Sequence, residues 1–263
     1  MDVVGIEPRF CRLCLPDAVF YGIGGPKMQA QGLDAWWPME KLSVMGFVEV
    51  LKHYREISRI RRQLKKRLLE NPPDVFIGID APDFNLGLET DLKAAGIRTI
   101  HYVSPSIWAW RGGRIKKIAR AVNRVLALFP MEPPIYAKHG VDARFVGHPL
   151  ADAMPLDPDR AAARRALGLA EQGTVVALLP GSRAAEVKHL GARFFQAAAL
   201  IQKAQPATQF IVPAVPHLQP QIEAAARASG LGDAVKVLRG QSHAALAACD
   251  VTLIASGTAT LEA

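Results

Sequence analysis

The stretch Val75-Phe-Ile-Gly-Ile-Asp-Ala-Pro-Asp-Phe-Asn-Leu86 decides both the fold and the place of the first candidate site. Its first five residues form an apolar run without alternation, which is typical of a parallel strand covered on both faces. Pro82 then suits the first turn of a helix. Three polar side chains gather where this strand ends: Asp80, Asp83 and Asn85.

These polar side chains allow three interpretations: a metal site, an acid–base pair or the cap of the next helix. The metal interpretation is the weakest, because no histidine or further carboxylate stands beside the pair. Asp83 would lie just inside the helix, where the helix dipole stabilises a carboxylate and keeps it ionised. An ionised carboxylate is also the form that a general base requires, so the cap and the base remain compatible.

Similar apolar runs recur along the whole chain with amphipathic helices between them, and this βαβα pattern predicts a doubly wound α/β fold. The predicted strands are Ala18–Ile23, Val75–Ile79, Arg98–Val103, Arg124–Phe129, Arg144–Val146, Val175–Leu179, Gln209–Val212, Val235–Leu238 and Val251–Ala255. Residues 147–160 contain three prolines and read as a linker. We therefore predict two Rossmann-like domains, 1–152 and 153–263.

The composition indicates a folded protein with anionic partners. Half of the 263 residues are hydrophobic, 21% are charged, and the formal net charge is +8. No apolar run approaches the roughly 20 residues that span a bilayer, and no secretory signal is evident. Three cysteines make no disulfide framework, which suits a reducing cytoplasm. A single C-x-x-C without a second pair or a nearby histidine disfavours a zinc site.

Two loops in the second half have the features of an anion site. In ALLPGSRAAEV, Gly181 permits a tight turn, Ser182 suits the N-cap of a helix, and Arg183 adds a fixed positive fork for a diphosphate. The segment VTLIASGTATLEA repeats the strand, turn and helix start, and its polar positions are Ser256, Gly257, Thr258 and Glu262. Glu262 could accept hydrogen bonds from two ribose hydroxyls. The alternatives are ordinary strand-to-helix turns and a solvated glutamate.

Two further segments combine aromatic or apolar residues with cations. In HYVSPSIWAWRGGR, residues Ser104, Trp108 and Arg111 could bind a sugar ring and phosphate or single-stranded nucleic acid, or form a core pair of tryptophans beside a solvated basic helix. In SVMGFVEVLKHYREISRIRR, apolar residues cover more than one helix face at Val44, Phe47, Val48 and Leu51. A basic amphipathic helix of this kind lies on an anionic membrane or packs on the protein surface.

Seven strings in one order closely resemble the lipid-A-disaccharide synthase family, bacterial glycosyltransferases of the GT-B fold. They are GGPKMQAQG, LSVMGFVEVL, PDVFIGIDAPDFN, HYVSPSIWAWR, FVGHPLADAMP, LPGSRAAEV and ASGTATLE. The resemblance runs from about Pro16 to Ala263. It implies an inverting transfer of 2,3-diacylglucosamine from UDP to 2,3-diacylglucosamine 1-phosphate, which forms the β-1,6-linked disaccharide of lipid A and releases UDP. It implies no metal and no nucleic acid.

The resemblance also implies roles for individual residues. Asp83 becomes the general base for the acceptor 6-hydroxyl, and Asp80 and Asn85 position it or the sugar. Substrate contacts extend to Ser104, Trp108 and Arg111, and UDP contacts to Gly181, Ser182, Arg183, Ser256, Gly257, Thr258 and Glu262. The stretch Val44–Leu51 meets acyl chains or the membrane, which places the protein at the cytoplasmic face of the inner membrane as a peripheral protein, with a homodimer expected at full length.

The sequence departs from the family at both ends. The family begins with a strand and a Gly-Glu-Thr/Ala-Ser-Gly-Asp loop that this sequence lacks, and it continues beyond Ala263. We therefore expect an N-terminal domain without its first strand, an incomplete C-terminal domain, and little or no activity from these 263 residues alone. Two other hypotheses remain: another UDP-sugar enzyme such as a soluble GT-B epimerase, and a non-enzymatic membrane or nucleic-acid binder.

Overall fold

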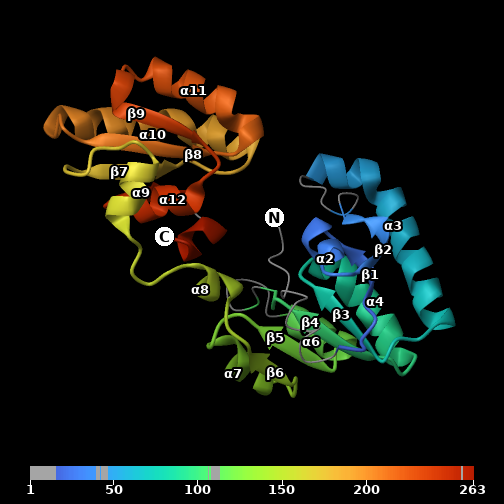
Figure 1. Cartoon of the computed structure of the whole chain (residues 1–263). Coiled ribbons are helices and arrows are strands. Elements are labelled where there is room, and N and C mark those ends of the chain that lie inside the picture. Colours follow the sequence, from blue (N-terminus) through green and yellow to red (C-terminus); the bar gives the residue numbers. More distant parts are fainter. Residues whose placement is uncertain (1–15, 40–41, 43–46, 106, 108–112, 256) are drawn as a thin grey trace. The chain divides into compact units, whose positions relative to one another are not determined.

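The computed structural model describes residues 16–39, 42, 47–105, 107, 113–255 and 257–263. The chain divides into two compact units between Pro149 and Leu150, inside the short helix α8 (Pro149–Ala153). The sequence predicts a division three residues later, after residue 152. The first unit precedes this division and the second unit follows it, and each is described by itself (Figure 1). Both alternate parallel strands with helices, as the sequence predicts.

The first unit contains a four-stranded parallel sheet in the order β3-β4-β5-β6 and a separate parallel pair, β1-β2. Its elements are β1 (Tyr21–Gly24), α2 (Pro26–Ala30), β2 (Asp34–Pro38), α3 (Phe47–Glu70), β3 (Val75–Ile79), α4 (Pro82–Ala94), β4 (Arg98–Tyr102), α6 (Arg114–Ala121), β5 (Arg124–Ala127), α7 (Glu132–Ala137) and β6 (Ala143–Phe145). The sequence does not predict β2, because this strand is short, begins with an acid and ends in proline, which lacks a donor for the sheet.

Helix α3 holds the β1-β2 pair against the rest of the first unit. Every fourth residue along its second half is buried: Ile60, Leu64 and Leu68. The last two pack with leucines of α4 and with aromatic rings of β1 and β2. On that pair, Trp36 stacks on Tyr21 with ring centroids 4.8 Å apart, and the Arg67 guanidinium lies 3.7 Å from the centroid of Trp36. The basic helix therefore contributes both apolar and cation–π contacts to the core.

The second unit is a parallel sheet of order β10-β7-β8-β9 between two layers of helices (Figure 1). Its elements are α9 (Arg160–Ala166), β7 (Val175–Leu179), α10 (Ala184–Ala204), β8 (Gln209–Ala214), the 3-10 turn η2 (Pro216–Leu218), α11 (Gln219–Ala228), η3 (Gly232–Ala234), β9 (Val235–Arg239), α12 (Ser242–Ala248), β10 (Val251–Ile254) and η4 (Thr258–Leu261). The sequence places a helix after β10, but the structure has only the 3-10 turn η4 there.

Strand β7 shows why an unbroken apolar run predicts a central parallel strand. All five of its residues are buried. Val176 and Leu178 face the cluster built with α10 and α11. The other three residues, Val175, Ala177 and Leu179, face the cluster built with α9 and α12. Successive side chains of a strand point to opposite faces, so burial on both faces requires an apolar residue at every position.

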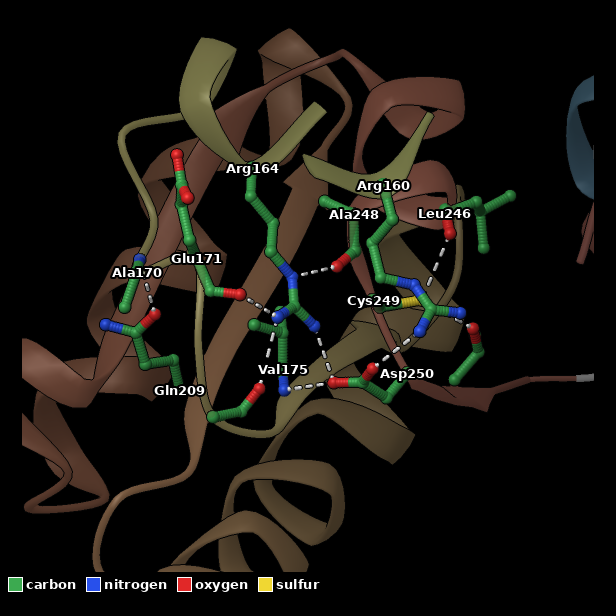
Figure 2. A network of polar contacts seen from close by, with 12 residues as sticks. Arg160, Arg164, Ala170, Glu171, Val175, Gln209, Leu246, Ala248, Cys249 and Asp250 are labelled. Atoms are coloured by element: carbon green, nitrogen blue, oxygen red, sulfur yellow. Dashed lines mark hydrogen bonds and ion pairs between the residues drawn. The ribbon is translucent and has the colours of Figure 1, made fainter. Parts of the chain in front are cut away.

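A polar network closes the second unit at the amino-terminal ends of β7 and β10 (Figure 2). Arg164 of α9 donates from Nε to the Ala248 carbonyl at 2.9 Å and from Nη2 to Asp250 Oδ2 at 2.7 Å. The same carboxylate oxygen accepts the Val175 N–H at 2.8 Å. Because only 6% of the Arg164 side chain is exposed, these contacts are largely removed from water. The network joins two helices to two strands at the end opposite the carboxyl-terminal loops.

Candidate functional site

The turn between β3 and α4 carries the first group of predicted site residues. Helix α4 begins at Pro82, so Asp83 lies in its first turn, as the sequence predicts. Asn85 holds the turn from the helix side, because its side-chain amide donates to the carbonyls of Ile79 at 3.2 Å and of Asp80 at 2.8 Å. From the sheet side, the Asp80 N–H donates to the Tyr102 carbonyl at 2.9 Å. The Asn85 amide is therefore engaged in shaping the turn.

The backbone around this turn is strained at non-glycine residues. Asp80 and Ala81 have φ values of 47° and 41°, and Val103, just after β4, has a φ of 73°. L-residues rarely adopt such values, and a β-branched residue is an outlier there. Strain of this kind persists where the surroundings impose it, and it gathers at functional sites. All three residues lie at the carboxyl ends of neighbouring parallel strands, the edge where α/β proteins bind ligands.

Asp83 and Asp80 differ sharply in their contacts. Asp83 Oδ1 accepts a hydrogen bond from Nη2 of Arg114, the first residue of α6, at 3.0 Å. The Asp83 side chain is 85% exposed and that of Arg114 is 25% exposed. Asp80 is half-buried, and its carboxylate has no hydrogen-bond or ion-pair partner among the residues that the structure describes. The pair is not evident from the sequence, where Arg114 reads as part of a basic helix face, because its partners are 31 residues apart.

Ser104 lies in a buried polar cluster beyond β4. Its hydroxyl is 2.8 Å from the hydroxyl of Tyr136 and donates to the Pro105 carbonyl at 3.1 Å. Burial raises the pKa of the nearby Glu132 carboxyl, while hydrogen bonds from Ser104 and from the Phe129 amide oppose the rise. Burial likewise raises the pKa of Tyr136 to about 12. The cluster fixes the β4 and β5 loops, and the substrate-binding role predicted for Ser104 stays a prediction.

A fully buried pair, Glu89 and His101, links α4 to the sheet beneath the strained turn. His101 Nδ1 of β4 lies 2.8 Å from Oε1 of Glu89, and both side chains are fully buried. Within the described residues, Glu89 Oε2 and His101 Nε2 have no hydrogen-bond partner. Gly78 leaves room for this pair, since a Cβ there would lie 2.0 Å from Glu89 Oε1. The pair therefore sets the spacing between α4 and β3.

Several predicted site residues cannot be placed. Val44, Trp108, Arg111 and Ser256 lie outside the described residues. Phe47, Val48 and Leu51 belong to the first turns of α3, and Thr258 begins η4, but their side chains are not described. The proposed contacts of these eight residues remain predictions.

The loop after β7 places the predicted anion-binding residues together. Gly181 has a φ of 129°, and α10 begins at Ala184 with Arg183 as its N-cap. The prediction of Ser182 as the N-cap is wrong by one residue. The physical reason is Glu186, whose Oε2 accepts the backbone N–H groups of Ser182 at 3.0 Å and of Arg183 at 3.2 Å. Glu186 thus satisfies the N–H groups of the two residues just before α10, whereas an N-cap hydroxyl would accept N–H groups inside the first turn.

The loops after β9 and β10 bring a further acid near a histidine. Glu262 follows η4, and its Oε2 lies 3.6 Å from Nε2 of His243, in the first turn of α12. Gln241, which precedes α12, has a φ of 61°, and Gly257 precedes η4 with a φ of 146°. The sequence predicts Gly257 and Glu262 as site residues but gives no signal for His243, which lies on an otherwise alanine-rich helix. Arg183, His243 and Glu262 therefore all follow carboxyl ends of strands in this sheet.

No group of three or more His, Cys, Asp or Glu side chains within the described ranges could hold a metal ion. No helix in the described part of the chain combines the length and the hydrophobicity needed to cross a membrane.

Comparison with known proteins identifies relatives over nearly the whole chain. A family model described as lipid-A-disaccharide synthetase matches residues 12–263. A lipid-A-disaccharide synthase of Albidiferax ferrireducens is 65% identical over 243 residues, which cover 92% of this chain and 62% of that protein. The lipid-A-disaccharide synthase of Dechloromonas aromatica is 62% identical over 252 residues, which cover 95% of this chain and 66% of that protein. The chain thus spans about two thirds or less of the length of these relatives.

Solved structures with the same fold are distant in sequence. A UDP-GlcNAc 2-epimerase from Neisseria meningitidis bound to UDP-GlcNAc has a TM-score of 0.57 at 11% identity, covering 88% of this chain and 66% of that one. MurG of Acinetobacter baumannii has a TM-score of 0.54 at 14% identity, and the match covers 92% of this chain and 74% of that one. At such identities the likeness shows the fold alone, which is GT-B. Together with the family match, it leads to one conclusion: the chain belongs to the lipid-A-disaccharide synthetase family.

Proposed function

We propose that this chain carries the acceptor side and part of the donor side of an inverting glycosyltransferase. The reaction moves 2,3-diacylglucosamine from UDP to 2,3-diacylglucosamine 1-phosphate, forming the β-1,6 disaccharide of lipid A and UDP. The observation that carries the proposal is the 65% identity to a lipid-A-disaccharide synthase over 92% of the chain. In this proposal residues 1–152 bind the acceptor and residues 153–263 bind UDP.

The proposed chemistry needs one base and one stabilised leaving group. A carboxylate removes the proton of the acceptor 6-hydroxyl. At the same time the hydroxyl oxygen attacks the anomeric carbon of the donor sugar from the face opposite UDP. The bond between that carbon and the diphosphate oxygen breaks, and the electron pair leaves with UDP. Arg183 and the first amides of α10 would stabilise the negative charge that develops on the diphosphate. Residues near the uridine would be Gly257 and Glu262. The mechanism uses no cofactor.

The contacts in the first unit bear on which carboxylate is the base. Asp83 remains the base predicted from the resemblance, but its carboxylate is held by Arg114 at 3.0 Å. Asp80 has no such partner in the described residues and sits at the strained carboxyl end of β3. Asp83 stays the proposed base, with Arg114 orienting its carboxylate. Asp80 is the alternative carboxylate at the same turn.

The experiment uses the chain by itself and a chimera. In the chimera, these residues replace the 62% of the Albidiferax ferrireducens protein that they match. Both are incubated with the two acylated substrates, and UDP and disaccharide are measured. The chimera should approach the rate of its parent. A folded chimera without UDP release would contradict the proposal.

Matched variants of the chimera test the base. Asp83→Asn should lower kcat by at least about a hundredfold, because general-base catalysis contributes about that much or more. Asp80→Asn should keep more of the rate if its role is to position the base or the sugar. The opposite ranking would give the role of base to Asp80. Thermal unfolding of both variants shows whether either loss comes from misfolding.

An anionic membrane surface is the second partner in this proposal, with a peripheral place at the cytoplasmic face of the inner membrane and a homodimer of the whole protein. Four exposed cations recur at helical spacing along α3: Arg55, Arg59, Arg62 and Lys66. Flotation with phosphatidylglycerol vesicles should be lost at high salt and in the double variant Arg59→Glu, Lys66→Glu. The double variant Arg193→Glu, Lys203→Glu changes two exposed cations of α10 by the same charge and serves as the control.

The alternative function, a soluble UDP-sugar epimerase, is not favoured. The epimerase structures share 10–16% identity with this chain, which supports the fold and no shared reaction. Incubating the chimera with UDP-GlcNAc and no acceptor separates the two functions. Formation of the 2-epimer would support the alternative, whereas transfer that requires acylated substrates supports the glycosyltransferase.

A further inference from the structure

The carboxylate of Glu186 occupies the donors that a diphosphate would need at the β7–α10 loop. Its Oε2 accepts two backbone N–H groups, from Ser182 at 3.0 Å and from Arg183 at 3.2 Å. Its Oε1 forms an ion pair with Nη1 of Arg183. Backbone amides and an arginine fork are the groups with which proteins bind phosphates. The protein therefore places an anion of its own in this loop.

Helix capping explains only part of this arrangement. A glutamate at the third position of a helix commonly accepts the N–H of the N-cap residue, here Arg183. The Ser182 N–H lies one residue before the cap, and the guanidinium of Arg183 belongs to no capping motif. Capping thus accounts for one of three contacts, while all three are explained by a loop that favours an anion at this point.

Gly181 leaves the space into which Glu186 folds. A Cβ on Gly181 would lie 2.5 Å from Glu186 Cβ and 2.7 Å from its Oε2. Its backbone φ of 129° is also one that residues other than glycine rarely adopt. The glycine that was predicted to permit a tight turn therefore also lets this carboxylate approach the backbone amides of the loop.

The Glu186 carboxylate is held in its charged form. Partial burial raises the pKa of Glu186, but the hydrogen bonds from Arg183 and Ser182 and the charge of the guanidinium outweigh it and lower the pKa below its usual value. At neutral pH the loop thus contains a full negative charge. A diphosphate and this carboxylate cannot accept the same N–H groups, and their like charges repel at such distances.

We propose that Glu186 is an internal anion that closes the diphosphate loop of the unliganded protein, and that a nucleoside diphosphate binds by displacing its carboxylate from Ser182 and Arg183. The inference rests on the proposed function in one respect, which is that this loop receives the diphosphate of UDP. It adds an autoinhibitory contact whose strength sets the affinity for the ligand. Removing the charge of Glu186 without removing its hydrogen-bonding capacity should therefore strengthen binding.

The test is calorimetric titration of the 263-residue chain and its Glu186→Gln variant with UDP, and separately with inorganic diphosphate. Glutamine keeps a carbonyl oxygen that can accept the Ser182 and Arg183 N–H groups, so the helix cap remains. The Kd for both probes should fall about tenfold, the effect of removing one like charge at a partly screened distance. Thermal unfolding should show that the variant is folded like the parent.

Glu223→Gln is the matched control. Glu223 lies on α11 of the same unit, accepts a hydrogen bond from Gln219 at 2.7 Å and carries the same charge. If Glu223→Gln strengthens binding as much as Glu186→Gln, net charge explains the effect and the inference is wrong. An unchanged or weaker affinity of Glu186→Gln also overturns it, whereas binding by the variant alone supports it.

The outcomes separate this inference from the proposed function. If the parent and Glu186→Gln bind UDP equally, the nucleotide site stands and only the role of Glu186 is overturned. If neither binds UDP nor diphosphate at millimolar concentration, the nucleotide site proposed for this loop is wrong, and the inference falls with it.

Discussion

Arg164 shows how one buried charge holds several elements of the second unit. Its guanidinium is almost fully buried against Asp250 and three backbone carbonyls. Removing Arg164 would take a donor from all three carbonyls, which costs free energy for each buried acceptor left unsatisfied, while Asp250 would keep Arg160 at 3.0 Å. A side chain of this kind contributes to stability because its hydrogen-bond partners are well placed around it, and the number of ion pairs in the protein matters less.

Arg164→Ala should lower the free energy of unfolding by about 3 kcal/mol, measured by urea denaturation. Arg165→Ala is the neighbouring control, because Arg165 is 57% exposed and pairs with a 58% exposed Glu171. An exposed pair contributes at most about 1 kcal/mol. Equal losses in the two variants would contradict the role given to burial.

Tyr136 makes the stability of the first unit depend on pH. Burial raises the pKa of its phenol from 10.0 to about 12. Because the folded state disfavours the charged phenolate, the contribution of Tyr136 to stability is intact below pH 10 and falls as pH rises from 10 toward 12, by about 3 kcal/mol in total. Tyr136→Phe should flatten this dependence in urea unfolding measured across that range. Parallel curves for the parent and the variant would rule out Tyr136 as the source.

At the scale of elements, the spacing between α4 and β3 depends on Gly78. The β3 backbone lies against the buried pair of Glu89 and His101, so no side chain fits between strand and helix. This spacing also positions the strained turn that carries Asp80. The same contact therefore bears on both stability and the candidate site.

Gly78→Ala should destabilise the chain by more than about 3 kcal/mol, because the new Cβ would lie 2.0 Å from Glu89 Oε1. Gly87→Ala, inside α4, is the control. Its Cβ would meet only the mobile end of Arg61 at 3.2 Å, and alanine favours the helix by about 0.5–1 kcal/mol. The midpoint of thermal unfolding of Gly87→Ala should equal or exceed that of the parent. Comparable losses of stability in the two variants would show that the spacing between α4 and β3 does not determine the effect.

At the scale of the whole molecule, the two units have separate cores. Among the described residues, each buried cluster draws its members from one unit only. Residues 154–159 join α8 to α9, and Leu156 in that segment is fully exposed. A unit with its own core resists unfolding when the connection is cut.

Limited thermolysin digestion should therefore cut beside Leu156 and leave a carboxyl-terminal fragment that persists. Mass spectrometry identifies the cut, and circular dichroism of the purified fragment should show mixed α/β structure with a cooperative thermal transition. Rapid loss of this fragment after the cut would show that the second unit depends on the first.

Much of the fold was predictable, because parallel strands buried on both faces need unbroken apolar runs. Val75–Ile79 and Val175–Leu179 were predicted with the bounds that the structure has. The missed strand, Asp34–Pro38, is stabilised by pairing with β1 and packing near α3, and neither contact is visible in a five-residue pattern. Local sequence also misplaced the N-cap of α10, because a side chain three residues into the helix caps it instead.

The sequence by itself determined that this is a GT-B chain of the lipid-A-disaccharide synthetase family and that polar residues gather where its strands end. The family follows from the seven strings that resemble it, and the strand ends follow from apolar periodicity, prolines and glycines, which act locally along the chain. Only the tertiary structure decided which of those residues are engaged. Arg114 reaches Asp83 from another helix, leaving Asp80 without a partner in the described residues, and Glu186 folds back over the Gly181 loop. Contacts between residues distant in sequence depend on how the elements pack.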